Sequence, residues 1–404
     1  MPRATRYLSP SEIRLIADGV KEIFAVTTVR GDVDRERLQR ALCALVRERP
    51  RLGATIERDG DGYVFCDQGA RAPEIRVRRV ALHTEINTPL ERTRALVRVA
   101  ILPDGAQSHV TLAIDHPIGD GRFIVATNAR LWALYTGAPG DAAVPAAEDV
   151  VVEAPMEARL QGRFDEAELA ESVARIAKTP PAAALAVRSD PGPDATRFEG
   201  ARLDAETSGA LFAVARAQSV SVHSLVCGVL MTVFRTRFDP AGAPHTIACD
   251  SPVDLRARLR PPLPNDVPGL CVGFATASVS TNGDEDVVHL ARACQVQMDA
   301  ARATSLPEKF LLVTAKLPMD IHNRTTMLVS NLGRLAVPPL PDELEFVDLQ
   351  LVTTGTASPP FFFVTTLRGQ LRLTLVYSEI HHDPARMRSL MTDIELALGG
   401  VART

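Results

Sequence analysis

The chain has 404 residues, a size at which one hydrophobic core usually gives way to two domains. Hydrophobic residues make up 46% of the chain and charged residues 23%, which is typical of a globular protein and excludes long disorder. The 45 Lys and Arg residues against 49 Asp and Glu residues give a formal charge of -4. Because nucleic-acid binding needs a basic surplus, we expect no nucleic acid among the partners.

The apolar segments are short, and polar residues interrupt them. The segment 220–234 falls short of the ~20 residues that cross a bilayer, so we expect no membrane span. The N-terminus is polar and lacks the apolar stretch of a secretory signal, which predicts a cytoplasmic protein. The 6 cysteines are spread singly, without a CxxC pair, and are expected to be reduced core residues.

The first part of the chain is expected to alternate strands with amphipathic helices. In chain order we predict a strand at 24–29, a helix capped by Asp34 that ends near Arg49, strands at 97–102 and 109–115, and a helix at 122–135. The tight loop between the last strand and the last helix starts at His116.

The middle of the chain, residues 138–198, is rich in Ala, Pro and Asp around one charged helix near 164–178. We predict an N-terminal lobe at 1–178, an interlobe connection at 179–200 and a C-terminal lobe at 201–404. In the second half we predict helices capped by Asp204 and Ser221, a helix at 287–303, strands at 246–249, 326–330, 345–352, 361–366 and 371–378, and a last helix from Asp383 to Gly399 and Gly400. Both halves mix strands and helices, so the predicted fold class is α/β (α+β).

The segment 116–121, HPIGDG, is the sharpest local motif and lies on a turn between a strand and a helix, where function is often found. Histidine is the side chain best suited to move a proton near neutral pH, which makes His116 a candidate general base. Pro117 and the two glycines oppose a helix through the loop and so disfavour a zinc-ligand pair. By itself, the H-x-x-x-D spacing fits a solvated loop histidine equally well.

Four further segments accompany this motif in a fixed order: LSPSE at 8–12, ERPRLGATI at 48–56, SPVDLRARL at 251–259 and VSNLGRL at 329–335. Together they resemble the condensation-domain superfamily, which includes chloramphenicol acetyltransferase-like enzymes, peptide condensation domains and polyketide-associated acyltransferases. Among these branches the chain is most similar to the phthiocerol/phthiodiolone dimycocerosyl transferase type, whose members esterify hydroxyls of polyketide-derived products.

Two departures from the superfamily patterns reduce the range of functions that the resemblance implies. Condensation domains usually carry a second histidine where this chain has Asp115, which makes peptide-bond synthesis less favoured. The D-F-G-W-G element of the plant branch is absent, and the single tryptophan, Trp132, falls in a predicted helix instead.

The resemblance implies two lobes of related fold that face each other across a tunnel, with the His116 loop at its centre. A thioester donor is already activated, so His116 would act as base on an incoming hydroxyl without an acyl-enzyme. Ser330 or Asn331 would supply a hydrogen bond to the developing oxyanion. No cofactor is expected, since coenzyme A or a carrier-protein phosphopantetheine enters as part of the substrate.

Asp120 and Gly121 are expected to be structural, with Arg256 as the buried ion-pair partner of Asp120. Two alternatives remain open for Arg256. It could form a solvated basic turn with Arg258 and Arg260, or it could dock an acidic carrier protein.

For His223, His381 and His382, the sequence context predicts structural roles. In His381-His382-Asp383, the aspartate is better explained as a helix cap and neighbouring histidines on a strand point to opposite sides, so we expect no metal. His223 is expected to be a hydrogen-bonded core residue. No G-x-S-x-G, P-loop or G-x-G-x-x-G segment supports a serine hydrolase or a nucleotide-binding protein.

These observations predict an O-acyltransferase that moves an acyl group from an acyl-CoA or acyl-carrier-protein thioester to a hydroxyl of a lipid or polyketide-type acceptor. We expect a monomer. Two alternatives stay open: an amide-forming condensation enzyme, and a catalytically silent module that binds carrier proteins.

Overall fold

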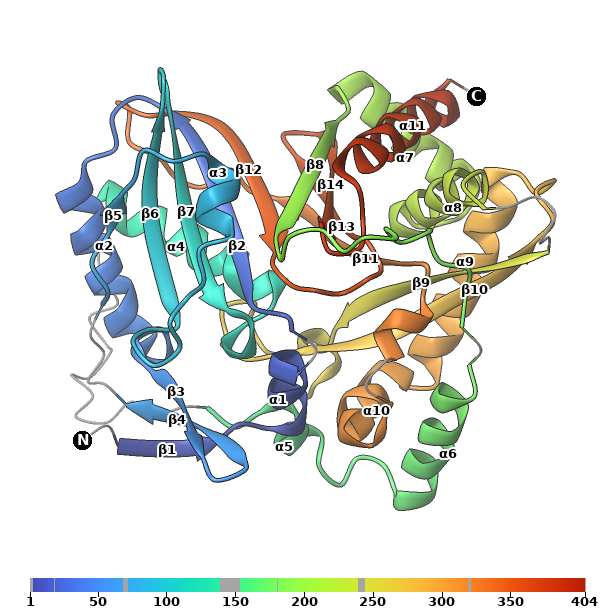
Figure 1. Ribbon diagram of the computed structural model, residues 1–404, viewed down its shortest axis with the longest axis horizontal. Coiled ribbons are helices and arrows are strands. Elements are labelled where there is room, and N and C mark those ends of the chain that lie inside the picture. Colours follow the sequence, from blue (N-terminus) through green and yellow to red (C-terminus); the bar gives the residue numbers. More distant parts are fainter. Residues whose placement is uncertain are drawn as a thin grey trace. The chain divides into compact units, whose positions relative to one another are not determined.

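The computed structural model describes residues 3–17, 19–67, 72–138, 153–179, 181–238, 244–318 and 321–403. The chain forms two compact units, and neither is continuous in sequence (Figure 1). The first unit comprises Met1–Gln161, Arg256–Cys271 and Val337–Gly355, and the second comprises Gly162–Leu255, Val272–Ala336 and Thr356–Thr404.

This division differs from the contiguous lobes predicted from the sequence. The helix α6 (Glu166–Ala177) contacts α10 (Leu306–Val313), so the first unit ends before it, at Gln161. The strand β12 (Glu345–Thr353) pairs with β2 (Glu22–Arg30) and so returns to the first unit from the far end of the chain. Sequence periodicity indicates a strand but not its partner, so the sequence alone predicts lobes that are continuous segments.

The first unit is built on a five-stranded sheet with the order β12-β2-β7-β6-β5, in which only the β5–β6 pair is parallel. Helix α4 packs on β2 and β7, and helix α2 packs on α4. A three-stranded sheet, β1-β4-β3, lies in the same unit. The remaining elements of this unit are β1 (Arg3–Tyr7), α1 (Pro10–Ala17), α2 (Arg35–Glu48), η1 (Pro50–Gly53), β3 (Thr55–Asp59), β4 (Gly62–Asp67), β5 (Arg76–Val77), α3 (Leu82–Ile86), β6 (Val97–Asp104), β7 (Gln107–Asp115), η2 (His116–Ile118), α4 (Gly121–Thr136), α5 (Met156–Leu160) and η4 (Arg256–Arg258).

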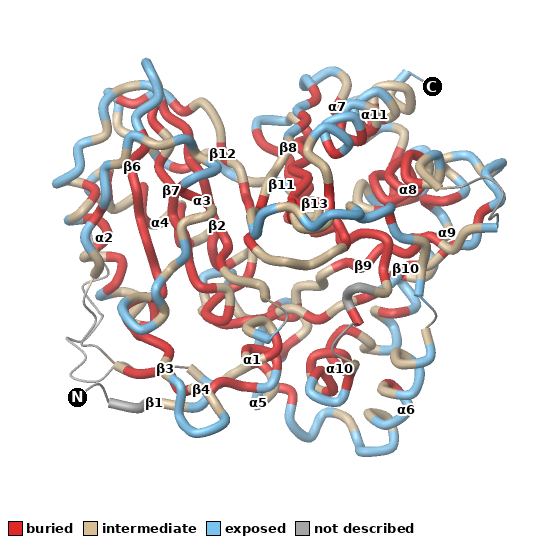
Figure 2. The backbone as a smooth tube through the Cα atoms, in the orientation of Figure 1, coloured by how far each residue is buried: buried red, intermediate tan, exposed pale blue. Residues whose placement is uncertain are grey.

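Local signals account for the helices that support the sheet. Asp34 caps α2 by accepting hydrogen bonds from the backbone N–H groups of Glu36 and Arg37 at 2.8 and 3.0 Å. Leu38, Leu42 and Leu45 lie on one face of α2 and are fully buried. Figure 2 shows the buried residues of this unit running along β2, β6 and β7, which form its core.

The second unit contains a six-stranded mixed sheet with the order β10-β9-β11-β13-β14-β8. Strand β11 runs parallel to β9 and β13, while the other pairs are antiparallel. Mixed sheets with packed helices in both units confirm the predicted α/β class. The remaining elements are β8 (Thr196–Arg202), α7 (Ala205–Ala217), α8 (Val222–Arg235), β9 (His245–Asp254), β10 (Val272–Thr281), α9 (Val287–Ala303), η5 (Thr314–Lys316), η6 (Ile321–Arg324), β11 (Met327–Leu335), β13 (Phe361–Leu367), β14 (Gln370–Ser378) and α11 (Pro384–Ala402).

The last helix, α11, was predicted to end at Gly399 and Gly400 but continues through them to Ala402. All six cysteines are free thiols, and five of them are buried. Among the described residues, no single helix has the length and apolarity of a membrane span. The two helices α7 and α8 reach that length only together, and they meet at 102°.

Candidate active site

The HPIGDG loop lies in the first unit, between the end of β7 and the start of α4, as the sequence predicted. His116 begins the short helix η2 directly after β7. Its backbone N–H donates to the carbonyl of Lys21 at 3.1 Å, and its own carbonyl accepts from the N–H of Gly119 at 3.2 Å. Gly121, predicted to be structural, is the first residue of α4. The backbone of the loop is therefore anchored on both sides of the histidine.

Gly119 allows the loop to lie close to the core. A Cβ atom at this position would lie 2.1 Å from Cδ1 of the Phe123 ring, well inside van der Waals contact. Phe123 is fully buried in the first turn of α4 and cannot easily move aside. The glycine of the motif is thus explained by packing against α4.

His116 is half-buried, and its two ring nitrogens differ in environment. Nδ1 is enclosed and makes no hydrogen bond to a described residue. Burial lowers the pKa of His116 below its usual value, while the nearby carbonyls of His116 and Gly119, outside hydrogen-bonding geometry, and the charge of Asp120 partly oppose this. The imidazole is therefore neutral at pH 7. A proton on Nδ1 would face these carbonyls and leave the lone pair of Nε2 available as a base.

Asp120 is almost fully buried, at 1% exposure, and both of its carboxylate oxygens are occupied. Oδ1 accepts from the N–H groups of Arg122 and Phe123 at 3.0 and 3.1 Å, which caps α4. Oδ2 accepts from Nη1 of Arg256 at 2.8 Å and from the N–H of Cys271 at 3.0 Å. Asp120 therefore joins the His116 loop, helix α4 and the segment 256–271.

The segment 256–271 is held to the loop by backbone contacts as well. The N–H of Gly269 donates to the carbonyl of Ile118 at 2.9 Å, and the φ of Gly269 is +120°, a conformation that favours glycine. Arg256 donates through Nη2 to the carbonyl of Val267 at 3.0 Å, and its side chain is 1% exposed. The solvated-turn and carrier-docking alternatives are therefore wrong for Arg256, although Arg260 in the same segment is exposed.

A second buried ion pair, which the sequence analysis missed, lies beneath this segment. Arg51 donates to Glu12 at 3.2 Å, and both side chains are 2% exposed. Arg6 binds the same carboxylate through two hydrogen bonds of 2.8 and 2.7 Å. A Cβ on Gly269 would lie 3.3 Å from Nη1 of Arg51, so the guanidinium supports the backbone that pairs with the loop. The S-x-x-E pattern from Ser9 to Glu12 is the signal that marks this carboxylate, since the Ser9 N–H donates to Glu12 at 2.8 Å.

Asp115, the residue before the histidine, is engaged by Arg92. The guanidinium of Arg92 binds both carboxylate oxygens, at 2.7 and 3.0 Å, and Asp115 is 1% exposed. Burial raises the pKa of Asp115 to about 6, with Arg92 lowering it and Glu22 raising it further. The carboxylate is thus ionised at neutral pH and paired, which suits a structural role better than proton transfer.

Replacing Asp115 with asparagine should therefore reduce activity less than replacing His116 with alanine. The asparagine keeps the shape of the side chain but loses one charge-assisted hydrogen bond to Arg92. The main expected effect is therefore a decrease in the free energy of unfolding of about 1–3 kcal/mol. Parallel measurement of kcat and of the midpoint of thermal unfolding for the two variants checks this. A lower kcat in the asparagine variant would mean that the roles of the two residues are reversed.

Ser330 and Asn331 lie on β11, in the second unit. Ser330 is 7% exposed, and Oδ1 of Asn331 accepts from the N–H of Gly333 at 2.8 Å, at the point where the register of β11 and β13 shifts. The Asn331 side chain therefore stabilises this irregularity. The oxyanion role of both residues stays a prediction.

The other singled-out histidines make hydrogen bonds within the second unit. Nε2 of His223 lies 2.9 Å from Oγ of Ser251, and burial lowers the pKa of His223 to about 4, so the ring is neutral. Nε2 of His381 and of His382 lies 3.0 and 2.6 Å from the carbonyls of residues 356 and 358, and Asp383 caps α11. These contacts match the structural roles expected for the three histidines and the aspartate.

Known acyltransferases are similar to this chain in sequence. Residues 192–376 match the family described as the phthiocerol/phthiodiolone dimycocerosyl transferase C-terminus. A phthiocerol/phthiodiolone dimycocerosyl transferase from Mycobacterium leprae (strain TN) is 27% identical over 297 residues, which cover 67% of each chain.

Three solved structures share the fold over nearly their whole length. Polyketide synthase associated protein 5 from Mycobacterium tuberculosis has a TM-score of 0.76 at 20% identity and covers 100% of this chain and 99% of its own. The trichothecene 15-O-acetyltransferase from Fusarium sporotrichioides has a TM-score of 0.75 at 13% identity, covering 98% of this chain and 95% of its own. The first condensation domain of the CDA synthetase has a TM-score of 0.73 at 15% identity, covering 99% and 96%.

The chain therefore has the two-lobed fold of condensation domains and chloramphenicol acetyltransferase-like enzymes, and its class is that of the acyltransferases. Within this class its sequence is similar to that of the phthiocerol/phthiodiolone dimycocerosyl transferases. Both the resemblance and the enzyme class predicted from the sequence are confirmed.

Proposed function

We propose that this acyltransferase moves an acyl group from a thioester of coenzyme A or of a carrier protein to a hydroxyl group of a lipid or polyketide-type acceptor. The product is an ester and a free thiol. The enzyme needs no cofactor, because the thioester is itself the activated donor. It works as a monomer. Similarity to a dimycocerosyl transferase supports the acyl transfer and the class of acceptor.

The observation that carries this proposal is the state of His116 on its anchored loop. The ring is neutral at pH 7 because burial lowers its pKa, and Nδ1 is enclosed while Nε2 makes no hydrogen bond to a described residue. A neutral imidazole with one available lone pair is the requirement for a general base. Asp120 and Arg256 act as positioning residues that hold the loop through the buried ion pair.

The reaction follows from that base. Nε2 takes the proton of the acceptor hydroxyl as its oxygen forms a bond to the thioester carbonyl carbon. The carbonyl π electrons move to the oxygen, and they return as the C–S bond breaks. The leaving thiolate then takes the proton from the imidazolium, which restores the neutral histidine. Ser330 or Asn331 is proposed to donate a hydrogen bond to the transient oxyanion.

Ester formation is favoured over amide formation by the residue next to the base. Condensation domains usually carry a histidine at this position, whereas this chain has an aspartate that is buried and bound by Arg92. An ionised and paired carboxylate offers no second proton acceptor there.

The test is mass spectrometry of reactions that contain the purified protein, a panel of acyl thioesters and matched acceptors that differ only in carrying a hydroxyl or an amine. We expect a new ester from the hydroxyl acceptors, and a far smaller yield of it from the His116→Ala variant. A product from the amine acceptors alone would establish amide synthesis instead. Carrier-protein binding without any product over the whole panel would indicate the silent module.

A further inference from the structure

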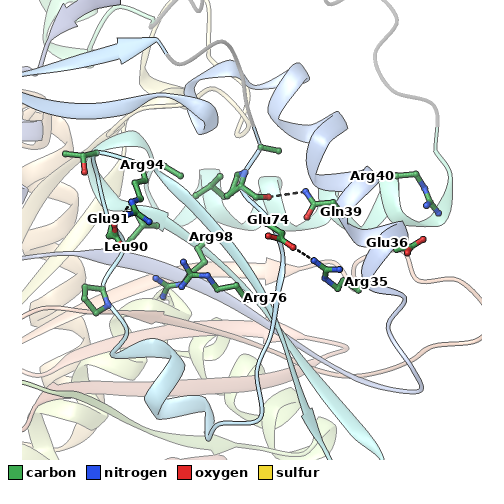
Figure 3. A pocket seen from close by; sticks show the side chains of 16 residues that line it. Arg35, Glu36, Gln39, Arg40, Glu74, Arg76, Leu90, Glu91, Arg94 and Arg98 are labelled. Atoms are coloured by element: carbon green, nitrogen blue, oxygen red, sulfur yellow. Dashed lines mark hydrogen bonds and ion pairs between the residues drawn. The ribbon is translucent and has the colours of Figure 1, made fainter. Parts of the chain in front are cut away.

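A large cavity lies in the first unit. It has a volume of about 1030 Å³ and is lined by three segments: the first turns of α2, the stretch 72–76 before and within β5, and the stretch 89–98 that leads into β6 (Figure 3). Apolar residues such as Pro73, Leu90 and Val97 form part of the wall. Five arginines and three glutamates form the charged part, and none of them is used by the proposed reaction.

At the rim, two of the three glutamates form ion pairs with arginines. Glu74 pairs with Arg35, and Glu91 pairs with Arg94 at 2.8 Å. The partners in both pairs are exposed, and exposed pairs contribute little and open easily. These pairs therefore leave the arginines free to contact a ligand that offers a stronger acceptor.

Deeper in the wall, positive charge exceeds negative charge. Arg98 is 6% exposed and donates through Nε to Oε1 of Glu85 at 2.9 Å. The second oxygen of this fully buried carboxylate accepts from Arg78, so two guanidinium groups share one carboxylate. Glu22 also acts on Arg98, but its oxygens already accept from the N–H of Leu90 and the hydroxyl of Thr354.

Arg76 adds a third guanidinium. It lies beside Arg98 in the cavity wall (Figure 3), and its charge lowers the pKa of Arg98 further, after the larger effect of burial. Arg76 is exposed and forms no ion pair with a residue in the described part of the chain. Arg76 and Arg98 are thus two like charges held next to each other, and no ion pair within the described residues balances the charge of Arg76. An anion between the two guanidinium groups would stabilise this arrangement.

We propose that this cavity binds an organic ligand that carries a phosphate or diphosphate group, with that group between Arg76 and Arg98. The planar guanidinium fork matches phosphate oxygens in pairs, which favours phosphate over a simple halide or a single carboxylate. The cavity is far larger than the anion itself, and its apolar wall suits the organic part of the ligand. A buried arginine at the wall lies beyond the reach of a flat protein surface, so a small ligand fits better than a carrier protein.

The test measures binding rather than turnover, and its dependence on Arg76 separates binding in this cavity from binding of coenzyme A as part of the proposed donor. Inorganic diphosphate and coenzyme A are titrated into the purified protein by calorimetry at an ionic strength of about 0.15 M. We expect saturable binding that Arg76→Gln weakens about tenfold or more, the loss of one charge-assisted hydrogen bond. The control is Arg79→Gln, since Arg79 is exposed on the same segment but does not line the cavity. Its affinity should stay within about twofold of the wild type, because a distant exposed charge is screened.

Further arms of the experiment distinguish the source of the phosphate. Binding of coenzyme A that is tighter than that of diphosphate and is weakened by Arg76→Gln would assign the cavity to a nucleotide-type ligand. Arg76-dependent sedimentation with anionic phospholipid vesicles, with coenzyme A no better than diphosphate, would assign it to a lipid headgroup. The proposal is overturned if neither soluble anion nor the vesicles bind saturably, or if Arg79→Gln weakens binding as much as Arg76→Gln.

Discussion

Replacement of His116 with alanine should lower kcat by about two to four orders of magnitude. The loss is large because the two carboxylates nearest to His116 in the sequence are held in ion pairs: Asp115 is bound to Arg92, and Asp120 is bound to Arg256. The midpoint of thermal unfolding should change little, since the ring of His116 is only half-buried and makes no hydrogen bond to a described residue. Steady-state kinetics and thermal unfolding of the same preparation check both parts.

The pH profile provides the control for this assignment. The base must be neutral, and burial lowers the pKa of His116 below its ordinary value of ~6.5. The wild-type kcat/KM should therefore be constant near neutrality and fall only as the pH drops below that value. Asp115 also titrates in this range, at a pKa of about 6, so both proteins are compared in an Asp115→Asn background. There the residual activity of the His116→Ala variant should lack the acidic limb. Near wild-type turnover in the variant, or an unchanged acidic limb in that background, would contradict the role of His116.

Breaking the Asp120–Arg256 ion pair should destabilise the protein by about 3–5 kcal/mol for either single change. Both side chains are almost fully buried, at 2% and 1% exposure, so removal of one charge leaves the other unpaired in a medium of low dielectric constant. Asp120→Asn keeps the acceptor oxygen that caps α4, and Arg256→Met keeps much of the side-chain volume. We expect the double variant to lose clearly less than the sum of the single losses. Chemical denaturation of all four proteins measures this coupling.

Activity should follow the same pattern, because the pair joins the catalytic loop to the segment 256–271. Each single variant should show a reduced kcat even at temperatures where it remains folded. Arg260→Met is the matched control, since Arg260 is exposed in the same segment and should tolerate the change. Small additive losses from the two buried positions, equal to that of the control, would show that the pair does not hold the loop.

The local elements of this fold were determined by signals within a few residues. Asp34, Ser221 and Asp383 each cap a helix that starts at the next residue, as the sequence predicted. The helix α9 was predicted at 287–303 and occupies those residues. Caps and apolar periodicity act through neighbouring backbone groups, so no knowledge of the rest of the chain was needed.

The position of the proposed catalytic histidine, His116, was determined in the same way. A strand that ends at Asp115, two glycines and a helix that starts at Gly121 place the His116 loop on a turn whatever lies around it. The ion pair of Asp120 with Arg256 came from the family resemblance rather than from any local pattern, and the structure contains it. Its depth of burial, which decides its energetic effect, was not visible in the sequence.

Long-range pairing and charge balance were decided by the tertiary structure alone. Strand β10 alternates buried and more exposed residues over its 10 positions but was missed, because its buried face carries mainly small side chains, which give little apolar contrast until the neighbouring strand is known. Strands β12 and β2 were both predicted, but not their pairing across more than 300 residues, since register depends on which face the finished core buries. The contact of Arg51 with Glu12 and the excess of positive charge around Arg98 likewise arise only when distant segments meet. In the unfolded chain, water solvates each of these charged groups separately. Only when they are buried together does their pairing, or the lack of it, change the free energy of unfolding.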